Sequence, residues 1–296
     1  NYADDLAENS LKYGEALYYY ALAHKPTKVR NVLDLLISNS LVLSSAYPFD
    51  EDLDDHLRSF ITSPQLALTH IARLDIEAAQ LLQKSLSGYA TLRKFYDLRD
   101  GDLLKPTGTV KTSTKLRKSQ AAIALMAVIT SSGDQIRGGL YDRERDAVIH
   151  VEFLLALLGE AMVFIDKPDF ILTVPQIETL LFAIEDLKSA PSKVYSACAN
   201  FLRRVLTTSH ALDNETSGSA GLLQNSDKSV NNSGVCIIRN SMLASQPKRP
   251  LREKRGWDWR ESFSEETTGD DLLKLIRFSL AKDLAKAWLM EIDHKF

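Results

Sequence analysis

The sequence of 296 residues contains few of the residues that build disulfide frameworks, metal centres or tight turns. Its only cysteines are Cys198 and Cys236, which excludes a disulfide network and a four-cysteine zinc site. Glycine, with 13 residues, and proline, with 9, are scarce for this length, and this disfavours a sandwich or barrel of short strands. We therefore expect a helical protein of a reducing compartment.

The chain also lacks signals for membranes and secretion. It has no uninterrupted apolar run of about 18 residues, so we expect no membrane span. Its first ten residues, NYADDLAENS, are acidic and have neither the basic region nor the apolar core of a signal peptide. Because Asn1 is not a methionine, we expect the native start to lie elsewhere. We expect an intracellular protein that is not secreted.

No strong charge of one sign is present. The net charge is −3, and apolar residues make up 45% of the chain and charged residues 25%, as in ordinary globular proteins. This balance argues against a surface built throughout for nucleic acid, although a local basic patch remains open.

Apolar residues recur at helical spacing along most of the chain. Four prolines, Pro26, Pro64, Pro175 and Pro191, stand where they can open a helix in its first turn. We expect a loop at 99–115 and leave open a break near Gly88. The expected helices cover residues 4–24, 26–45, 49–60, 64–71, 76–98, 115–131, 143–165, 175–184, 191–208 and 268–293.

These patterns predict an all-α fold of about ten to twelve helices, arranged as an irregular α-solenoid or a large helical bundle. No repeat of fixed period is present. The composition changes after Thr208, where serine, asparagine and glycine dominate. We predict a helical body at 1–208, a disordered insertion at 209–256 that ends in a basic segment, and a tryptophan anchor with a C-terminal helix at 257–296 that packs back on the body.

The motifs that would indicate an enzyme or a metal site are incomplete. Asp50, Asp52 and Asp54 alternate as in an EF-hand loop, but Asp55 replaces the glycine of that loop and no acid stands at its last position. An acidic face for a basic partner remains open there. His150-Val151-Glu152 lacks the second half of a zinc deaminase signature. We predict no metal, no cofactor and no catalytic residue.

A basic stretch, PKRPLREKR, is the feature that these exclusions leave. Such short clusters are bound by nuclear-import receptors, contact phosphates or nucleic acid, or serve as solvated linkers. All three interpretations remain open, with nucleic acid the least favoured. The basic residues are Lys248, Arg249, Arg252, Lys254 and Arg255.

Trp257 and Trp259 follow directly and point the same way if the chain is extended. Both indoles would then enter one groove of the body while Asp258 stays outside. We favour structural docking, with a binding site for a partner protein as the alternative.

Together these features predict a non-enzymatic scaffold or adaptor of a larger assembly, nuclear or nucleocytoplasmic, that binds other protein subunits and, as a further candidate, an import receptor. The nuclear pore, chromatin complexes and ribosome-maturation particles are the candidate assemblies. Nucleic-acid binding through residues 248–255 is one alternative. The other is a helical enzyme or ligand-binding protein with a site at His150, Glu152, Glu160, Arg143 and Arg145.

Overall fold

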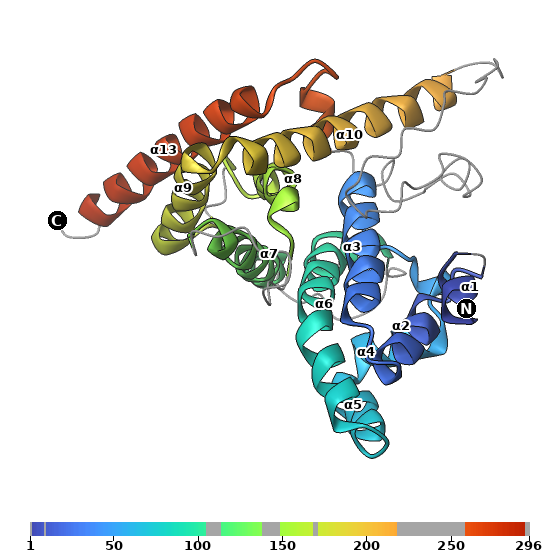
Figure 1. The fold of residues 1–296 in the computed structure, drawn as a ribbon. Helices are drawn as coiled ribbons and strands as arrows, with labels where there is room; N and C mark the ends of the chain where they lie inside the picture. Colours follow the sequence, from blue (N-terminus) through green and yellow to red (C-terminus); the bar gives the residue numbers. More distant parts are fainter. Residues whose placement is uncertain are drawn as a thin grey trace.

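A computed structural model of the chain describes residues 2–8, 10–104, 114–137, 149–167, 171–217 and 258–293. Within these ranges it contains eleven α-helices, four short 3₁₀-helices and no β-strand (Figure 1). This confirms the all-α fold and the expected number of helices.

In the first half of the chain, α2 packs against α1, α3 and α4, α5 packs against α4 and α6, and α3 also packs against α6. Pro26 and Pro64 open α3 and α5 as expected. The expected helix at 4–24 is instead two helices, because the chain turns at Leu11, which has a positive φ of 54°. The helices are α1 (Tyr2–Glu8), α2 (Tyr13–Leu22), α3 (Pro26–Leu43), α4 (Asp55–Thr62), α5 (Pro64–Ala72) and α6 (Ile76–Leu104), with η1 (Asp50–Asp52) before α4.

The structure of α6 answers the question left open at Gly88 and corrects the start of the expected loop at 99–115. The helix is unbroken at Gly88, because Leu86, Tyr89 and Leu92 are buried on either side and their packing outweighs the weak helix propensity of one glycine. It also continues to Leu104, through the start of the expected loop at 99–115. Residues 105–113 of that loop lie outside the described ranges.

The second half contains α7 (Thr114–Arg137), η2 (Val151–Phe153), α8 (Leu154–Glu160), η3 (Ala161–Val163), α9 (Val174–Ser189), α10 (Ser192–Ser217), η4 (Trp259–Ser262) and α13 (Gly269–Asp293). The single long helix expected at 143–165 was wrong for its described part. His150 is extended, and helix follows only as the short pieces η2, α8 and η3. All seven residues of α8 are buried, so this segment is core on every side.

The two halves are joined along one side by the long helix α10, which packs against α8 and also against α3 (Figure 1). Helix α10 continues to Ser217, past the expected end of the body at Thr208. The expected insertion lies mostly at 218–257, outside the described residues. Helix α13 then packs against α8, α9 and α10, so the C-terminal helix returns to the body.

Apolar spacing in the expected helix at 268–293 predicts a core stripe of Leu273, Ile276, Leu280, Leu284 and Trp288. The prediction is correct for the first three residues, which are at most 1% exposed, and wrong for Trp288, which is 62% exposed. At 100° per residue, position 288 lies well off the line of Leu280, and Ala287 is buried there instead.

Candidate functional site: the Trp259 anchor and the buried charge cluster

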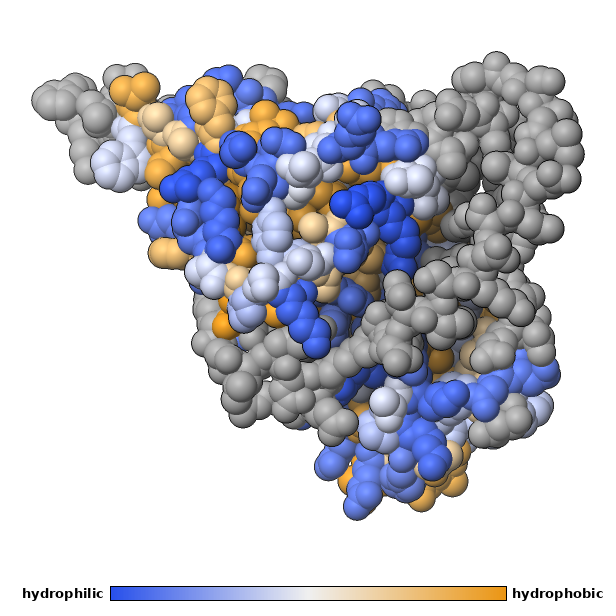
Figure 2. Space-filling view, turned by 45° about the horizontal axis from the view of Figure 1, so that its top comes forward, coloured by the Kyte–Doolittle hydropathy of each residue, from blue (hydrophilic) through white to orange (hydrophobic). Residues whose placement is uncertain are grey.

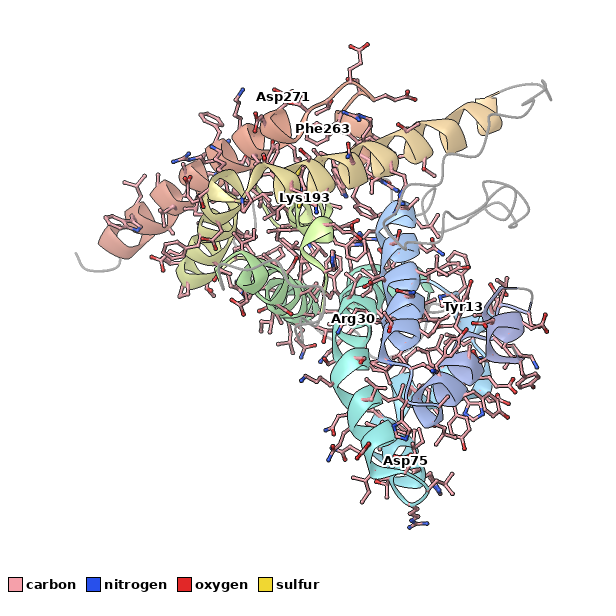
Figure 3. The ribbon with its side chains drawn as sticks, in the orientation of Figure 1. Tyr13, Arg30, Asp75, Lys193, Phe263 and Asp271 are labelled. Carbon is pink, nitrogen blue, oxygen red and sulfur yellow. The ribbon has the colours of Figure 1, made fainter. Side chains whose placement is uncertain are left out.

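The chain re-enters the body through the short helix η4. The side chain of Asp258 accepts a hydrogen bond from the backbone N–H of Arg260 at 3.0 Å and caps this helix. Asp258, Trp259 and Arg260 are each at most 2% exposed. Figure 3 shows the surrounding side chains, with Phe263 labelled where η4 leads towards α13.

Trp259 is held by a close fit to helix α8. A Cβ atom added to Gly159 would lie 2.6 Å from the indole ring, so only glycine allows this approach. The ring of Phe263 meets the indole edge to face, with 6.0 Å between centroids. Trp259 is therefore an anchor within the chain's own core.

Arg260 is a buried charge with its partner two residues away. Its Nε donates to Asp258 Oδ1 at 2.8 Å, and its Nη2 bonds Asp258 Oδ2. Its Nη1 donates to the backbone carbonyl of Val42, near the end of α3. Burial alone would lower the pKa of Arg260, but the bonded carboxylate of Asp258 raises it, so the guanidinium stays charged.

A second buried arginine binds the same end of α3. Arg99 on α6 donates to the carbonyl of Ser44 at 2.6 Å and to its hydroxyl at 2.9 Å. Ser44 ends the helix in the left-handed conformation, with a φ of 45°. Val42 and Ser44, whose carbonyls lie at the negative end of the helix dipole, are thus each bound by a different arginine.

Glu160, at the end of α8, completes this group. One carboxylate oxygen accepts from Arg99 Nη1 at 2.7 Å and the other from the hydroxyl of Tyr96 at 3.2 Å. Asp100 pairs with the same guanidinium at 2.9 Å. We call Asp100, Tyr96, Arg99, Glu160, Asp258 and Arg260 the buried charge cluster.

Within the buried charge cluster, the two arginines stay charged and Tyr96 stays a neutral hydrogen-bond donor. Burial, followed by the charge of Glu160, raises the pKa of Tyr96 well above its ordinary value, so this hydroxyl remains a donor. Burial opposes the charge of Arg99, but Glu160 and Asp100 raise its pKa. Glu160 is 0% exposed. The arrangement ties α3, α6, α8 and η4 together, and its carboxylates are bonded to arginines.

Of the residues named in the sequence analysis, Trp259, Glu160 and Asp258 fall in this site. The expectation that Asp258 stays outside was wrong, because its carboxylate is the partner that a buried Arg260 requires. The stretch was also not extended throughout, since η4 begins at Trp259. Trp257 and the basic residues Lys248, Arg249, Arg252, Lys254 and Arg255 lie outside the described residues.

Among the described residues of the enzyme alternative, His150 and Glu152 lie together, with 3.7 Å between Nδ1 and Oε1, and Glu160 is not part of this pair. His150 is buried at the start of η2, where its carbonyl accepts from Ser132 at 3.2 Å. Glu160 instead belongs to the buried charge cluster. Cys198 is buried, its thiol donates to the carbonyl of Val151 at 3.1 Å, and burial raises its pKa to about 12. Arg143 and Arg145 lie outside the described residues.

Sequence reasoning missed Arg99, Asp100, Tyr96 and Arg260. Arg99 and Asp100 stood at the start of an expected loop, and Arg260 follows a sequence segment with several other arginines and lysines. One signal was present: Glu160 is an isolated acid in the apolar run LLALLGEAM, and a buried carboxylate requires a buried cation. The sequence does not say which arginine supplies it.

Two further features of the described part of the chain concern metals and membranes. No group of three or more His, Cys, Asp or Glu side chains there could hold a metal ion. None of its helices is long and apolar enough to cross a membrane.

Comparison with known proteins gives one relative that bears on function. No protein-family model matches the chain. The chain is similar to Nucleoporin NUP85 of Chaetomium thermophilum, with 43% identity over 314 aligned positions. The match covers 99% of this chain but 26% of the relative, so the chain spans about a quarter of the length of the protein it resembles.

Proposed function

We propose that the chain is a helical scaffold segment of a nucleoporin, that it acts through protein–protein contacts in the nuclear pore, and that it is not an enzyme. The 43% identity to Nucleoporin NUP85 over nearly the whole chain carries this proposal. Of the three assemblies left open by the sequence, this similarity favours the nuclear pore. The proposed partners are other protein subunits of the pore.

The buried charge cluster supports the proposed role as a structural scaffold. The buried charge cluster places charged side chains in the core, where they bond one another and the end of α3. Loss of one partner of a buried ion pair strongly destabilises the folded protein, because it leaves the other charge buried and unpaired. The cluster therefore favours the one arrangement of the helices in which all its pairs form. A scaffold needs such a fixed arrangement because its binding surfaces must keep their relative positions.

We further propose that the basic segment, Lys248 to Arg255, directs import of the protein before assembly. Five basic residues among eight positions are opposed by Glu253 alone, a composition that import receptors bind. This assignment rests on the sequence.

The test is localisation of the full-length protein that carries this chain, tagged with a fluorescent protein. We expect a signal at the nuclear rim and co-purification of other nucleoporins, identified by mass spectrometry. A diffuse signal together with purification of the protein alone would overturn the scaffold proposal.

The import proposal is tested separately by replacing the five basic residues with serine. We expect newly made protein to reach the nucleus more slowly. The matched control replaces Lys115 and Lys118, exposed lysines of α7, and should import at the normal rate. Equal import rates for the unchanged protein, the five-serine variant and the control variant would refute the import proposal and leave the scaffold proposal intact.

A further inference from the structure

Arg204 on α10 is a half-buried arginine that has no carboxylate partner among the described residues. Its Nη2 donates to the hydroxyl of Ser38 on α3 at 2.6 Å, across 166 positions of the chain. Its guanidinium lies over the ring of Phe201, with 4.7 Å between the central carbon and the ring centroid. Its Nε is buried and has no hydrogen-bond partner. Arg204 therefore lies at the junction of α3 and α10 with part of its hydrogen-bonding capacity unused.

Three other arginines of the described chain are more deeply buried, and each of them bonds a carboxylate. Their side chains are at most 4% exposed. A carboxylate is the expected partner, because a buried charge without a counter-ion is costly. The pairs are Arg93 with Asp50, Arg99 with Glu160 and Arg260 with Asp258.

Arg204 loses contact with solvent without gaining such a partner. Burial lowers its pKa, and the charge of Glu152 opposes this shift. Glu152 forms no ion pair with Arg204 in the described structure, and its Oε1 instead lies 3.7 Å from Nδ1 of His150. The charge of Arg204 is therefore only partly compensated within the described chain.

The environment of Arg204 differs from that of charges at the surface. On the face drawn in Figure 2, hydrophilic side chains lie among hydrophobic ones and are open to solvent. Water solvates such charges, so they need no protein partner. The guanidinium of Arg204 packs on Phe201 and bonds Ser38, and water reaches only part of it. An anion that binds there meets a cation that is already held in place and already partly desolvated.

The planar guanidinium determines which ligand fits. It presents N–H groups in a fork that matches the two oxygens of a carboxylate or of a phosphate. Among the described residues, no atom accepts a hydrogen bond from Nη1 of Arg204, so this group remains for a ligand. The proposed partners are protein subunits, whose acidic side chains present carboxylates. An acidic side chain therefore fits both the residue and the proposed function.

We propose that Arg204 binds the carboxylate of an acidic side chain of a partner subunit at the junction of α3 and α10. This acid gives Arg204 the kind of counter-ion that Arg93, Arg99 and Arg260 have within the chain. Because α10 joins the two halves, the partner contacts the protein where these halves meet. This inference rests on the proposed scaffold function and names one residue that holds a subunit.

The first test compares the thermal unfolding of Arg204→Met with that of the native chain. Because a half-buried charge without a counter-ion costs stability, Arg204→Met should melt at the native temperature or higher. Arg260→Met is the matched control, and it should melt several degrees lower, because it breaks a pair within the chain. A similar fall for Arg204→Met would show that Arg204 serves the fold and would overturn the proposal.

The second test uses inorganic phosphate as the probe of oxyanion binding, at constant ionic strength against chloride. Phosphate also stabilises proteins by exclusion from their surface, so Arg204→Met supplies the baseline. We expect the melting temperature of the native chain to rise by about 2 °C more than that of Arg204→Met. Equal stabilisation of the two chains would show that Arg204 takes no oxyanion and would overturn the proposal.

The third test decides whether the ligand is a protein carboxylate. The full-length protein that carries this chain is purified with its pore subunits, as the native form, Arg204→Met and Arg204→Lys. We expect Arg204→Met to lose one subunit by roughly tenfold or more, and Arg204→Lys to lose less of it, because lysine keeps the charge without the fork. The control is Arg277→Met, which removes a 52% exposed arginine and should retain every subunit.

Full retention of all subunits by Arg204→Met would overturn the proposal and leave free phosphate as the ligand. Equal loss in Arg277→Met would overturn it as well, because any lost positive charge would then suffice. If the native protein itself brought down no pore subunit, the scaffold proposal would fail, and this inference would fail with it. The comparison of native protein with Arg204→Met thus separates the two failures.

Discussion

Arg260 donates a hydrogen bond to the backbone carbonyl of Val42, a residue 218 positions earlier in the chain. This contact joins the segment that re-enters the body after residue 257 to the end of α3 in the first half. Arg99, from α6, binds the carbonyl of Ser44 at the same helix end. The end of α3 is therefore the point where three distant parts of the chain meet.

Replacing Arg260 with methionine should lower the free energy of unfolding by about 3 to 5 kcal/mol, because it leaves the carboxylate of Asp258 buried without its partner. Urea unfolding followed by circular dichroism measures this change. Adding Asp258→Asn to the same chain removes the unpaired charge and should restore part of the loss.

The exposed pair of Arg277 and Glu185 provides the control for this prediction. Both side chains are 52% exposed, so Arg277→Met should change stability by less than about 1 kcal/mol. Similar losses for Arg260→Met and Arg277→Met would contradict the role we give to the buried charge cluster.

Gly159→Ala should destabilise the protein by about 1 to 3 kcal/mol, because the new Cβ would overlap the indole of Trp259. Gly133→Ala in α7 is the matched control. No atom lies within 4 Å of a Cβ built there, so alanine should leave stability unchanged or raise it by up to about 1 kcal/mol. Thermal unfolding distinguishes the two, and equal melting temperatures would contradict the close fit.

Asp97 should contribute a pH dependence of stability. Its side chain is 46% exposed, and partial removal from solvent raises its pKa to about 6, against the opposing charge of Arg93 and with a further increase from Asp50. The unfolded value is about 3.9, so between these two values the folded state binds more protons. This contribution to stability is therefore present at low pH and is lost as the pH rises towards 6.

The measurement is urea unfolding at a series of pH values between 4 and 7, in the range set by these pKa values. Asp97→Asn should remove this part of the pH dependence. Asp271 behaves oppositely, because hydrogen bonds from Thr268 lower its pKa, so Asp271→Asn should remove a contribution that is present above pH 4 or so. An unchanged profile for Asp97→Asn would show that this carboxyl titrates normally.

The thiol of Cys198 should resist alkylation in the folded protein. It is 0% exposed, and burial, with the charge of Glu152, raises its pKa to about 12. The experiment uses a Cys236→Ser chain, so that Cys198 is the one thiol present. Labelling by iodoacetamide at pH 8 should be slow and should accelerate with added urea. Fast labelling without urea would show that the core around α10 opens readily.

Local sequence signals predicted most helices but not their exact limits. Pro26, Pro64 and the run from Thr268 to Asp293 mark true helices, because first-turn prolines and apolar spacing act within the helix itself. The break at Gly88 and the loop start at Arg99 depended on local propensity, and packing in the core outweighed it.

The sequence by itself determined that this protein is all helical, because the 3.6-residue spacing of apolar side chains is a local property of the chain. It also indicated that Trp259 packs against the helical body, because a large apolar side chain gains most from burial. Only the tertiary structure decided that Asp258 is buried, that Glu160 pairs with Arg99, and that Arg260 reaches Val42. Pairing of buried charges depends on which distant segments meet, and side chains of the same type are equivalent until the fold brings one of them into place.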